Sequence, residues 1–308
     1  MPVNTKAIRK RIKSVTSTKK ITKTMEMVAT SKLKYAQNAV MASTPYSVLL
    51  RSMMAEVASR VEDAAAFPLL HQSPDPKRTL LFVVTSNRGL CGGFNSNLIR
   101  LGRKTYLAEV AAGRSVTLYV AGKKGIAALR WLGVPMEKKY TDIPDKPTYA
   151  DAERFAEDLT GPFLRGEVDR VLVVYPEFKS LGSQPPTVLT LCPLGGASPA
   201  SAGGPAGGGA SGAEAEPDTK GGVEFLFEPS PLAILERLLP LYVRLTVYRV
   251  LVSSVASEQI ARRTAMKLAT DNADEMVTLL TRNYNKARQG QITQELAEII
   301  GGAAALSK

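Results

Sequence analysis

The sequence predicts an α/β protein with two long terminal helices that form an antiparallel coiled coil and a small doubly wound (Rossmann-like) domain between them. Residues 4–62 and 231–300 carry apolar side chains at helical spacing and contain almost no glycine. The residues between them alternate between apolar runs typical of buried strands and amphipathic helical stretches. Helices at opposite ends of a chain can pair in antiparallel fashion when a middle domain returns the chain towards its start.

The first helix is predicted by apolar residues at spacings of three, four or their sums, among them Ile8, Ile12 and Val15. A continuous helix of ~60 residues would be about 90 Å long at 1.5 Å per residue. Pro45 is expected to bend or interrupt it, because proline lacks the amide donor that a helix interior needs. No compact domain can enclose a rod of that length.

The middle of the chain predicts four strands and three helices between about residues 76 and 194. We expect strands at TLLFVVTS, SVTLYVAG, DRVLVVYPEF and PPTVLTLCPL, and helices at FNSNLIRLGRKTYLAEVAA, KKGIAALRWLG and YADAERFAEDLTGPFLRG. The Gly- and Ala-rich stretch that follows cannot bury a core and is expected to form a disordered loop. The predicted organisation is a helix at 1–62, an α/β domain at 63–194, a low-complexity insertion at 195–222, and a last strand and second long helix at 223–308.

The second long helix is expected to begin at Pro231, to be interrupted early by Pro240, and to end in an unusual tip. The last residues read ITQELAEIIGGAAALSK, with apolar side chains on one side of a short helix followed by glycines and alanines. A soluble monomer does not normally leave such a tip in water. The sequence therefore predicts that the C-terminus is inserted into a partner.

The net charge of +12 is concentrated in the first helix. Residues 1–60 contain twelve Lys and Arg but only Glu26 and Glu56 as acids. Such a surface can meet nucleic acid, an anionic membrane or acidic proteins, and charge alone does not choose among them. The stretch ITKTMEMVATSKLKYAQNAV also has small and apolar residues on more than one face. It fits either a core helix with a solvated basic side or a rod that turns inside a sleeve.

The sequence offers little for catalysis. The loop SNRGLCGGFNSN lies between a predicted strand and helix, where α/β folds bind phosphates, but it matches neither GxGxxG nor a P-loop. A tight turn is the favoured interpretation. His71 is the single histidine, and Cys91 and Cys192 lack metal-binding or disulfide spacing. We therefore predict no catalytic residue, no metal and no cofactor.

Four blocks of sequence together resemble the γ subunit of the F-type rotary ATP synthase, its central stalk. They are ITKTMEMVATSKLKYAQ, TSNRGLCGGFNSNLI, ASEQIARRTAMKLATDNADEM and NKARQGQITQELAEIIGGAAAL. The resemblance implies a non-catalytic rotor shaft that couples proton flow through the c ring to ATP synthesis on the β subunits. The implied partners are the hexamer of α and β subunits, the ε subunit and the c-subunit ring, with no nucleic acid and no direct nucleotide binding. The implied location is peripheral, on the cytoplasmic side of a bacterial inner membrane.

The resemblance also assigns contacts residue by residue. Lys23 and Met25 match a shaft position near the acidic hinge loop of the catalytic subunits, and Arg100 and Arg103 match basic positions that face an acidic β loop. Near the top, the matching positions are Arg288 and Gln289, which pair with a catalytic-subunit loop, Thr293 and Glu295 one turn beyond, and Arg262 on the same helix. Cations facing carboxylates give a weakly directional attraction that can be renewed at each step.

Two departures and two alternatives accompany this interpretation. The insertion at 195–222 is longer and richer in Gly and Ala than the family leads us to expect, and the paired cysteines of chloroplast relatives are absent, which predicts no redox switch. The first alternative is a basic coiled-coil protein that binds nucleic acid through its first helix, although stacking aromatics are scarce there. The second is a nucleotide-dependent α/β enzyme, which the missing P-loop opposes.

Overall fold

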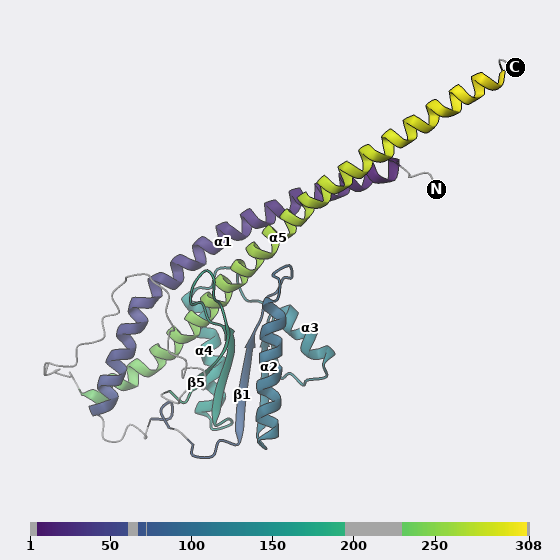
Figure 1. Ribbon diagram of the computed structural model, residues 1–308. Helices are drawn as coiled ribbons and strands as arrows, with labels where there is room; N and C mark the ends of the chain where they lie inside the picture. Colours follow the sequence, from purple (N-terminus) through teal and green to yellow (C-terminus); the bar gives the residue numbers. More distant parts are fainter. Residues whose placement is uncertain (1–4, 61–66, 72, 195–229, 307–308) are drawn as a thin grey trace. The chain divides into compact units, whose positions relative to one another are not determined.

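The computed structural model describes residues 5–60, 67–71, 73–194 and 230–306 (Figure 1). In chain order its elements are α1 (Thr5–Arg60), β1 (Arg78–Val84), α2 (Phe94–Ala111), β2 (Ser115–Ala121), α3 (Lys123–Trp131), β3 (Lys138–Tyr140), α4 (Tyr149–Leu164), β4 (Arg170–Pro176), β5 (Pro186–Cys192) and α5 (Pro231–Leu306). The predicted fold class is confirmed. Strand β3 was not expected, and the last strand predicted after residue 222 lies outside the described residues.

Neither long helix is interrupted at its proline, although an interruption was expected at Pro240 and a bend or an interruption at Pro45. Pro45 lies inside α1 and Pro240 inside α5. Around Pro45, the hydroxyls of Ser43 and Thr44 both donate to the carbonyl of Val40, at 2.9 and 2.8 Å. Such side-chain bonds add local support where a proline removes a backbone donor.

The described residues fall into two compact units, and each unit contains part of both long helices. The shaft unit comprises Met1–Lys32, Leu90–Gly92 and Gln259–Lys308, and the α/β unit comprises Leu33–Gly89 and Gly93–Glu258. The boundaries predicted from composition stay predictions, because they follow the sequence order rather than this division.

The sheet of the α/β unit has the strand order β3-β2-β1-β4-β5. All neighbours are parallel except β4 and β5, which pair antiparallel from Val171–Cys192 to Pro176–Pro186. The chain passes from β1 to β2 on one side and places β4 on the other side of β1. The sheet is therefore doubly wound, and its direction of winding changes between β1 and β4.

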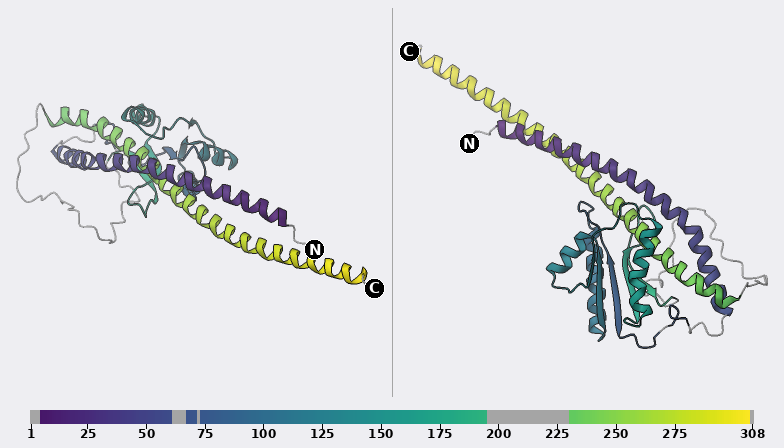
Figure 2. Two further views of the ribbon diagram at one scale, coloured as in Figure 1. Left: turned by 90° about the horizontal axis from the view of Figure 1, so that it is seen from above. Right: turned by 180° about the vertical axis from the view of Figure 1, so that it is seen from behind.

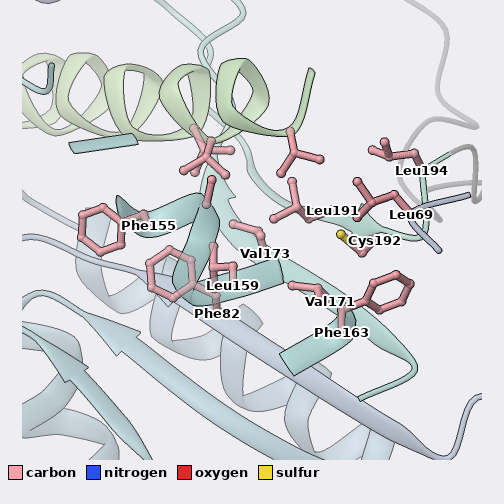
Figure 3. Close-up of a cluster of buried hydrophobic side chains, with 14 of the residues drawn as sticks. Leu69, Phe82, Phe155, Leu159, Phe163, Val171, Val173, Leu191, Cys192 and Leu194 are labelled. Carbon is pink, nitrogen blue, oxygen red and sulfur yellow. The ribbon is translucent and has the colours of Figure 1, made fainter. Parts of the chain in front are cut away.

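Both faces of the sheet are covered. On one face Phe82 and Val173 lie in a large apolar cluster with Phe155 of α4, residues of α5 and the end of α1 (Figure 3). The side chains of the other face alternate with these, and Val83 packs against Gly102 of α2. Burial on both faces explains why the strand sequences are continuous apolar runs.

A close approach between the residue after β1 and the turn after β2 explains one glycine of the α/β unit. Gly122 has φ 97°, and a side chain there would place its Cβ 2.2 Å from the carbonyl oxygen of Thr85. The Thr85 hydroxyl donates to the carbonyl of Ala121 at 2.7 Å and accepts the amide of Gly125 at 3.0 Å. Only glycine fits the position that joins β2 to α3.

Helix α5 contains a window that is apolar enough to cross a membrane by length and composition. However, 56% of that window is buried inside the protein, as in the core helix of a soluble protein. Burial within the chain accounts for this apolar character.

Candidate subunit-contact surfaces

In the shaft unit, α1 and α5 pair in antiparallel fashion. The Thr5 hydroxyl donates to Gln291 Oε1 at 3.3 Å, and the hydroxyl oxygens of Thr22 and Thr270 lie 2.8 Å apart. Lys19 and Asp274 form an ion pair between these two contacts. Residue numbers increase along α1 while those of its partners on α5 decrease, so the helices are antiparallel, as the predicted coiled coil requires.

The seam between these helices is narrow. Ala29 and Ala273 are buried, and Thr270 is only 8% exposed. Many large apolar side chains of the same two helices are not covered by the seam: Ile21, Met27, Val28, Leu268, Met276 and Leu279 are 44–61% exposed. Apolar groups on several faces of a solvent-exposed rod favour the interpretation that another protein encloses it.

Helix α5 extends beyond the start of α1 (Figure 2). Past Gln291, which contacts Thr5, no described residue of α1 is left to pair with it. Ile292, Leu296, Ile299 and Ile300 are 49–68% exposed there, at spacings that place them along one side of the helix. The tip predicted from the sequence is a single helix with an uncovered apolar stripe.

The contact residues predicted for the upper shaft are mostly exposed. Arg288, Gln289, Thr293 and Glu295 all lie on the surface of α5. The Thr293 hydroxyl donates to the backbone carbonyl of Gln289 at 3.0 Å, and Gln291 Nε2 donates to Glu295 Oε1 at 3.0 Å. Glu295 is therefore already engaged along its own helix, whereas the Arg288 side chain forms no such bond within the described part of the chain.

The remaining predicted shaft contacts differ in exposure. The Lys23 side chain is 56% exposed and forms an ion pair with Glu26 at 3.1 Å, and Met25 is half-buried. Arg262 is only 8% exposed. Its guanidinium is not displayed on an open surface as the motif match suggested, and a subunit contact there stays a prediction.

Arg100 and Arg103 lie on the outer face of α2 and border a groove between α2 and α3. This groove has a volume of about 670 Å³ and is lined by Ser96, Ile99, Arg100, Arg103, Lys104, Leu107, Ala128, Trp131 and Leu132. Trp131 is 85% exposed, and Leu107 is 50% exposed. Sequence reasoning named the two arginines but missed Trp131, since an aromatic residue in an amphipathic helix is usually part of a core.

The carboxyl end of the sheet, where doubly wound folds bind ligands, is occupied by α5. The crevice beside β1 retains only about 20 Å³, the scale of a single water molecule, and Leu251, Ser254 and Val255 of α5 line it. The hydroxyl of Ser253 accepts the amide of Phe178 and donates to the carbonyl of Pro176, both at 2.8 Å. The helix thus binds the loop after β4 where a nucleotide would bind in related architectures.

Within the described residues no group of three or more His, Cys, Asp and Glu could hold a metal ion. Both cysteines are buried. Burial raises the pKa of the Cys192 thiol to about 12, which keeps it protonated and unreactive. The exposed surfaces described above are available to protein partners.

These features define a shaft protein: a helical pair with an uncovered tip, and an α/β unit whose crevice at the carboxyl end of the sheet is filled by α5. The family model for ATP synthase matches residues 4–306. The ATP synthase gamma chain of Gemmatimonas aurantiaca is 46% identical over 305 residues, covering 98% of both chains, and that of Cutibacterium acnes is 40% identical over 319 residues, covering 100% of this chain and 98% of the other. The chain belongs to the ATP synthase gamma-chain family.

Solved structures agree in fold. A chain of the Euglena gracilis mitochondrial ATP synthase matches 98% of this chain and 94% of its own length, with a TM-score of 0.61 at 20% identity. A chain of the Tetrahymena thermophila mitochondrial ATP synthase central stalk matches 81% of this chain and 99% of its own, with a TM-score of 0.57 at 23% identity.

Family membership decides among the three interpretations of the sequence. The protein is a non-catalytic subunit of the ATP synthase complex, its rotary central stalk, and a component of a membrane-associated assembly. The ATP synthase family assignment therefore replaces the two alternatives, a nucleic-acid-binding protein and a nucleotide-dependent enzyme.

Proposed function

We propose that this chain is the rotor of a bacterial F-type ATP synthase, turned by proton flow through the c ring, and that each of its orientations favours a different conformation of the catalytic β subunits. The observation that carries the proposal is the α5 tip, a single helix with an apolar stripe at residues 292–300 and no partner among the described residues. Such a tip is stable in water only when another protein covers it. A central cavity in a hexamer of α and β subunits would provide that cover.

The coupling would be a free energy shared between distant sites. A shaft that contacts the three β subunits differently stabilises different conformations in each, and a symmetric shaft would couple nothing. The two helices support this asymmetry, because α1 begins at Thr5 beside Gln291 while α5 continues to Leu306. The shaft is therefore a helical pair as far as Gln291, and beyond that residue it is the single helix α5.

Exposed cations would supply the moving contacts. Lys23 on the shaft and Arg100 and Arg103 on α2 present positive charge to solvent. Carboxylates on β loops would attract them over several ångströms without requiring one geometry. Met25, half-buried beside Lys23, would pack against the same loops.

Near the tip, Arg288 and Gln289 would hydrogen-bond a loop of one catalytic subunit, with Thr293 and Glu295 one turn beyond. An exposed guanidinium suits this role, since it can form two parallel bonds to a carboxylate. Arg262 would act from a more covered position on the same helix.

The proposed partners are the α and β subunits, the ε subunit and the c-subunit ring. The complex would be attached peripherally to the cytoplasmic side of the inner membrane. The bacterial sources of the gamma chains at 40–46% identity support this location.

The test is co-expression of this chain with α and β subunits of a close bacterial relative, comparing the full chain with one that ends at Arg288. We expect the full chain to co-purify at one copy per hexamer, and the truncated chain to assemble but to pump fewer protons per ATP hydrolysed after reconstitution with the membrane sector. Failure of the full chain to form a complex with any cognate partners would refute the proposal.

A finer test exchanges single side chains. Arg288→Ala should lower the maximal rate of ATP hydrolysis by about five-fold, because loss of a solvent-accessible charged hydrogen bond costs about 1 kcal/mol. Arg282→Ala is the matched control, an exposed arginine of the same helix to which the family motif assigns no contact. Equal effects of the two substitutions would show that position 288 has no special role.

A further inference from the structure

The outer face of α2 forms one wall of the groove between α2 and α3. The residues of α2 that line this groove recur every three or four positions, which places them along one side of the helix. They are Ser96, Ile99, Arg100, Arg103, Lys104 and Leu107. The other wall is the end of α3, where Ala128 and Trp131 lie, followed by Leu132. Both helices belong to the α/β unit, so this surface, the α2–α3 groove, lies within one unit.

The α2–α3 groove leaves apolar side chains in water. Trp131 is 85% exposed, more than any other large apolar side chain of the described residues, and Leu107 is 50% exposed. A tryptophan buries about 150–250 Å² when it is covered, and tryptophan is enriched in the hot spots of protein interfaces. The volume of about 670 Å³ falls within the range of cavities that hold whole ligands. The groove can therefore admit several side chains of a partner.

The charge around the α2–α3 groove has one sign. Residues 94–132 contain seven Lys and Arg but a single acid, Glu109, which is buried and forms ion pairs with two arginines. Arg100, Arg103 and Lys104 are exposed, and no carboxylate of the described chain pairs with them. A charged rim of this kind selects a partner of opposite charge, while an apolar centre supplies much of the affinity. The groove thus favours an acidic partner with apolar side chains.

Shape and charge distinguish among the candidate occupants. A membrane takes up apolar side chains that protrude from a surface, whereas these side chains line a hollow. Single-stranded nucleic acid stacks its bases on several aromatic side chains, and Trp131 is the only aromatic residue among the described residues that line the groove. A second copy of this chain, with its net charge of +12, would be repelled. A protein segment that presents apolar side chains between carboxylates fits both the hollow and its rim.

We propose that the α2–α3 groove is a docking site for an acidic segment of a partner subunit, with Trp131 as the apolar anchor and with Arg100, Arg103 and Lys104 as the cations that bind its carboxylates. The inference rests on the rotor function proposed above and adds a property to the partner of Arg100 and Arg103, namely apolar side chains between its carboxylates. Charge alone would attract any acidic loop. An apolar anchor in a groove also fixes the position at which the segment binds.

The test uses Trp131 itself, because it is the single tryptophan of the chain. Hydroxyl-radical oxidation of Trp131, located by mass spectrometry, should be several-fold slower in the assembled complex than in the free chain. Carbodiimide cross-linking should join the amine of Lys104 to an Asp or Glu of a partner subunit, in a segment that also contains apolar residues. Both samples are kept in the same detergent without added lipid, so that the partner subunits are the only difference between them.

The other occupants are tested by the tryptophan fluorescence of the free chain. A blue shift of the emission with phosphatidylglycerol vesicles, with an oligonucleotide or at higher protein concentration would assign the groove to a membrane, a nucleic acid or a second copy, and would overturn the inference. Oxidation of Trp131 at equal rates in the free chain and in an active complex would also overturn it, while the rotor proposal would stand. If no active complex assembles with any cognate partners, the rotor proposal fails, and this inference fails with it.

Substitutions test the anchor and the rim separately. Trp131→Ala should lower the yield of the Lys104 cross-link several-fold, and Arg103→Glu should raise the oxidation of Trp131 in the complex towards its rate in the free chain. Leu164→Ala and Lys139→Glu are the matched controls, since both replace exposed residues of the α/β unit that do not line the groove. Equal effects of a substitution and its control would show that the groove is not the contact.

Discussion

Glu109 is the most enclosed charged side chain of the α/β unit that takes part in a described network. Its carboxylate accepts the Thr79 hydroxyl at 3.0 Å and Arg114 Nη1 at 3.1 Å, and it forms an ion pair with Arg170. Burial alone would raise the pKa of Glu109, but the charge of Arg170 and the hydrogen bonds outweigh it and lower the pKa below its ordinary value. The network joins α2 to β1 and β4.

Glu109→Gln should therefore destabilise the protein at neutral pH by roughly 2–3 kcal/mol, below the range for fully buried pairs because both guanidinium groups reach water. Since the folded-state pKa is lowered, the wild type loses this contribution as the pH falls below the ordinary carboxyl value, 4.5. The variant should have a flatter dependence of stability on pH in that range. Urea unfolding of the full chain between pH 3 and 7 measures both effects.

Glu167→Gln is the control, because that carboxylate pairs with Arg165 on the open surface. It should change stability little. A similar loss in both variants would contradict the role assigned to Glu109.

At the scale of elements, the glycines on either side of α3 separate two effects, an unusual backbone conformation and a close packing contact. Gly122 combines a positive φ with a carbonyl 2.2 Å from the place of a Cβ, whereas Gly133 has φ 68° and nothing within 4 Å. Gly133→Ala should cost about 1–2 kcal/mol through backbone conformation alone. Gly122→Ala should cost more, by several kcal/mol, since the junction of β2 and α3 would have to move away from Thr85 at the end of β1.

Thermal unfolding of the two variants measures the difference. Equal shifts in midpoint would mean that the Thr85 carbonyl can move aside, and that the contact does not fix the turn.

Helices were predictable from the sequence where they are long, and strands were predictable where both faces of the sheet are buried. The apolar runs of β1 and β4 and the periodicity of α1 and α5 identify them directly. Strand β3 was not, because three residues, Lys138–Tyr140, give no periodic signal and pair only with β2. The interruption expected at Pro240 was wrong, because tertiary packing keeps a helix continuous where local chemistry opposes it.

The exposure of the candidate contact residues was predictable in part, and their contacts stay predictions. Arg288, Arg100 and Arg103 are exposed as contact residues should be. The burial of Arg262 could not be anticipated, since a coiled-coil seam and a contact surface use the same helical spacing. The exposure of Trp131 depends on how α2 and α3 pack together, which no single segment encodes.

At the scale of the whole molecule, stability should be uneven. The strands of the α/β unit are buried on both faces, whereas residues 292–300 are exposed on a helix without a partner in the described chain. Amide exchange of the isolated full-length chain should be slow in β1 and fast in 292–300, because an isolated helical end of this length is marginal in water.

In the assembled complex the same end should become protected. Slow exchange of residues 292–300 in the free chain would contradict the expectation that this tip depends on a partner.

The position of α5 across the carboxyl end of the sheet has one more consequence. Leu235, Leu239 and Leu251 of this helix belong to the same apolar cluster as the strands. The core of the domain thus includes a segment of α5 that lies more than a hundred residues beyond β1 in the sequence. Residues 76–194, although they contain every described strand, are an incomplete folding unit: expressed alone, they would present an empty apolar cradle to water. The α/β domain and the long helix therefore cannot be separated into independent parts, because α5 supplies part of the domain's hydrophobic core.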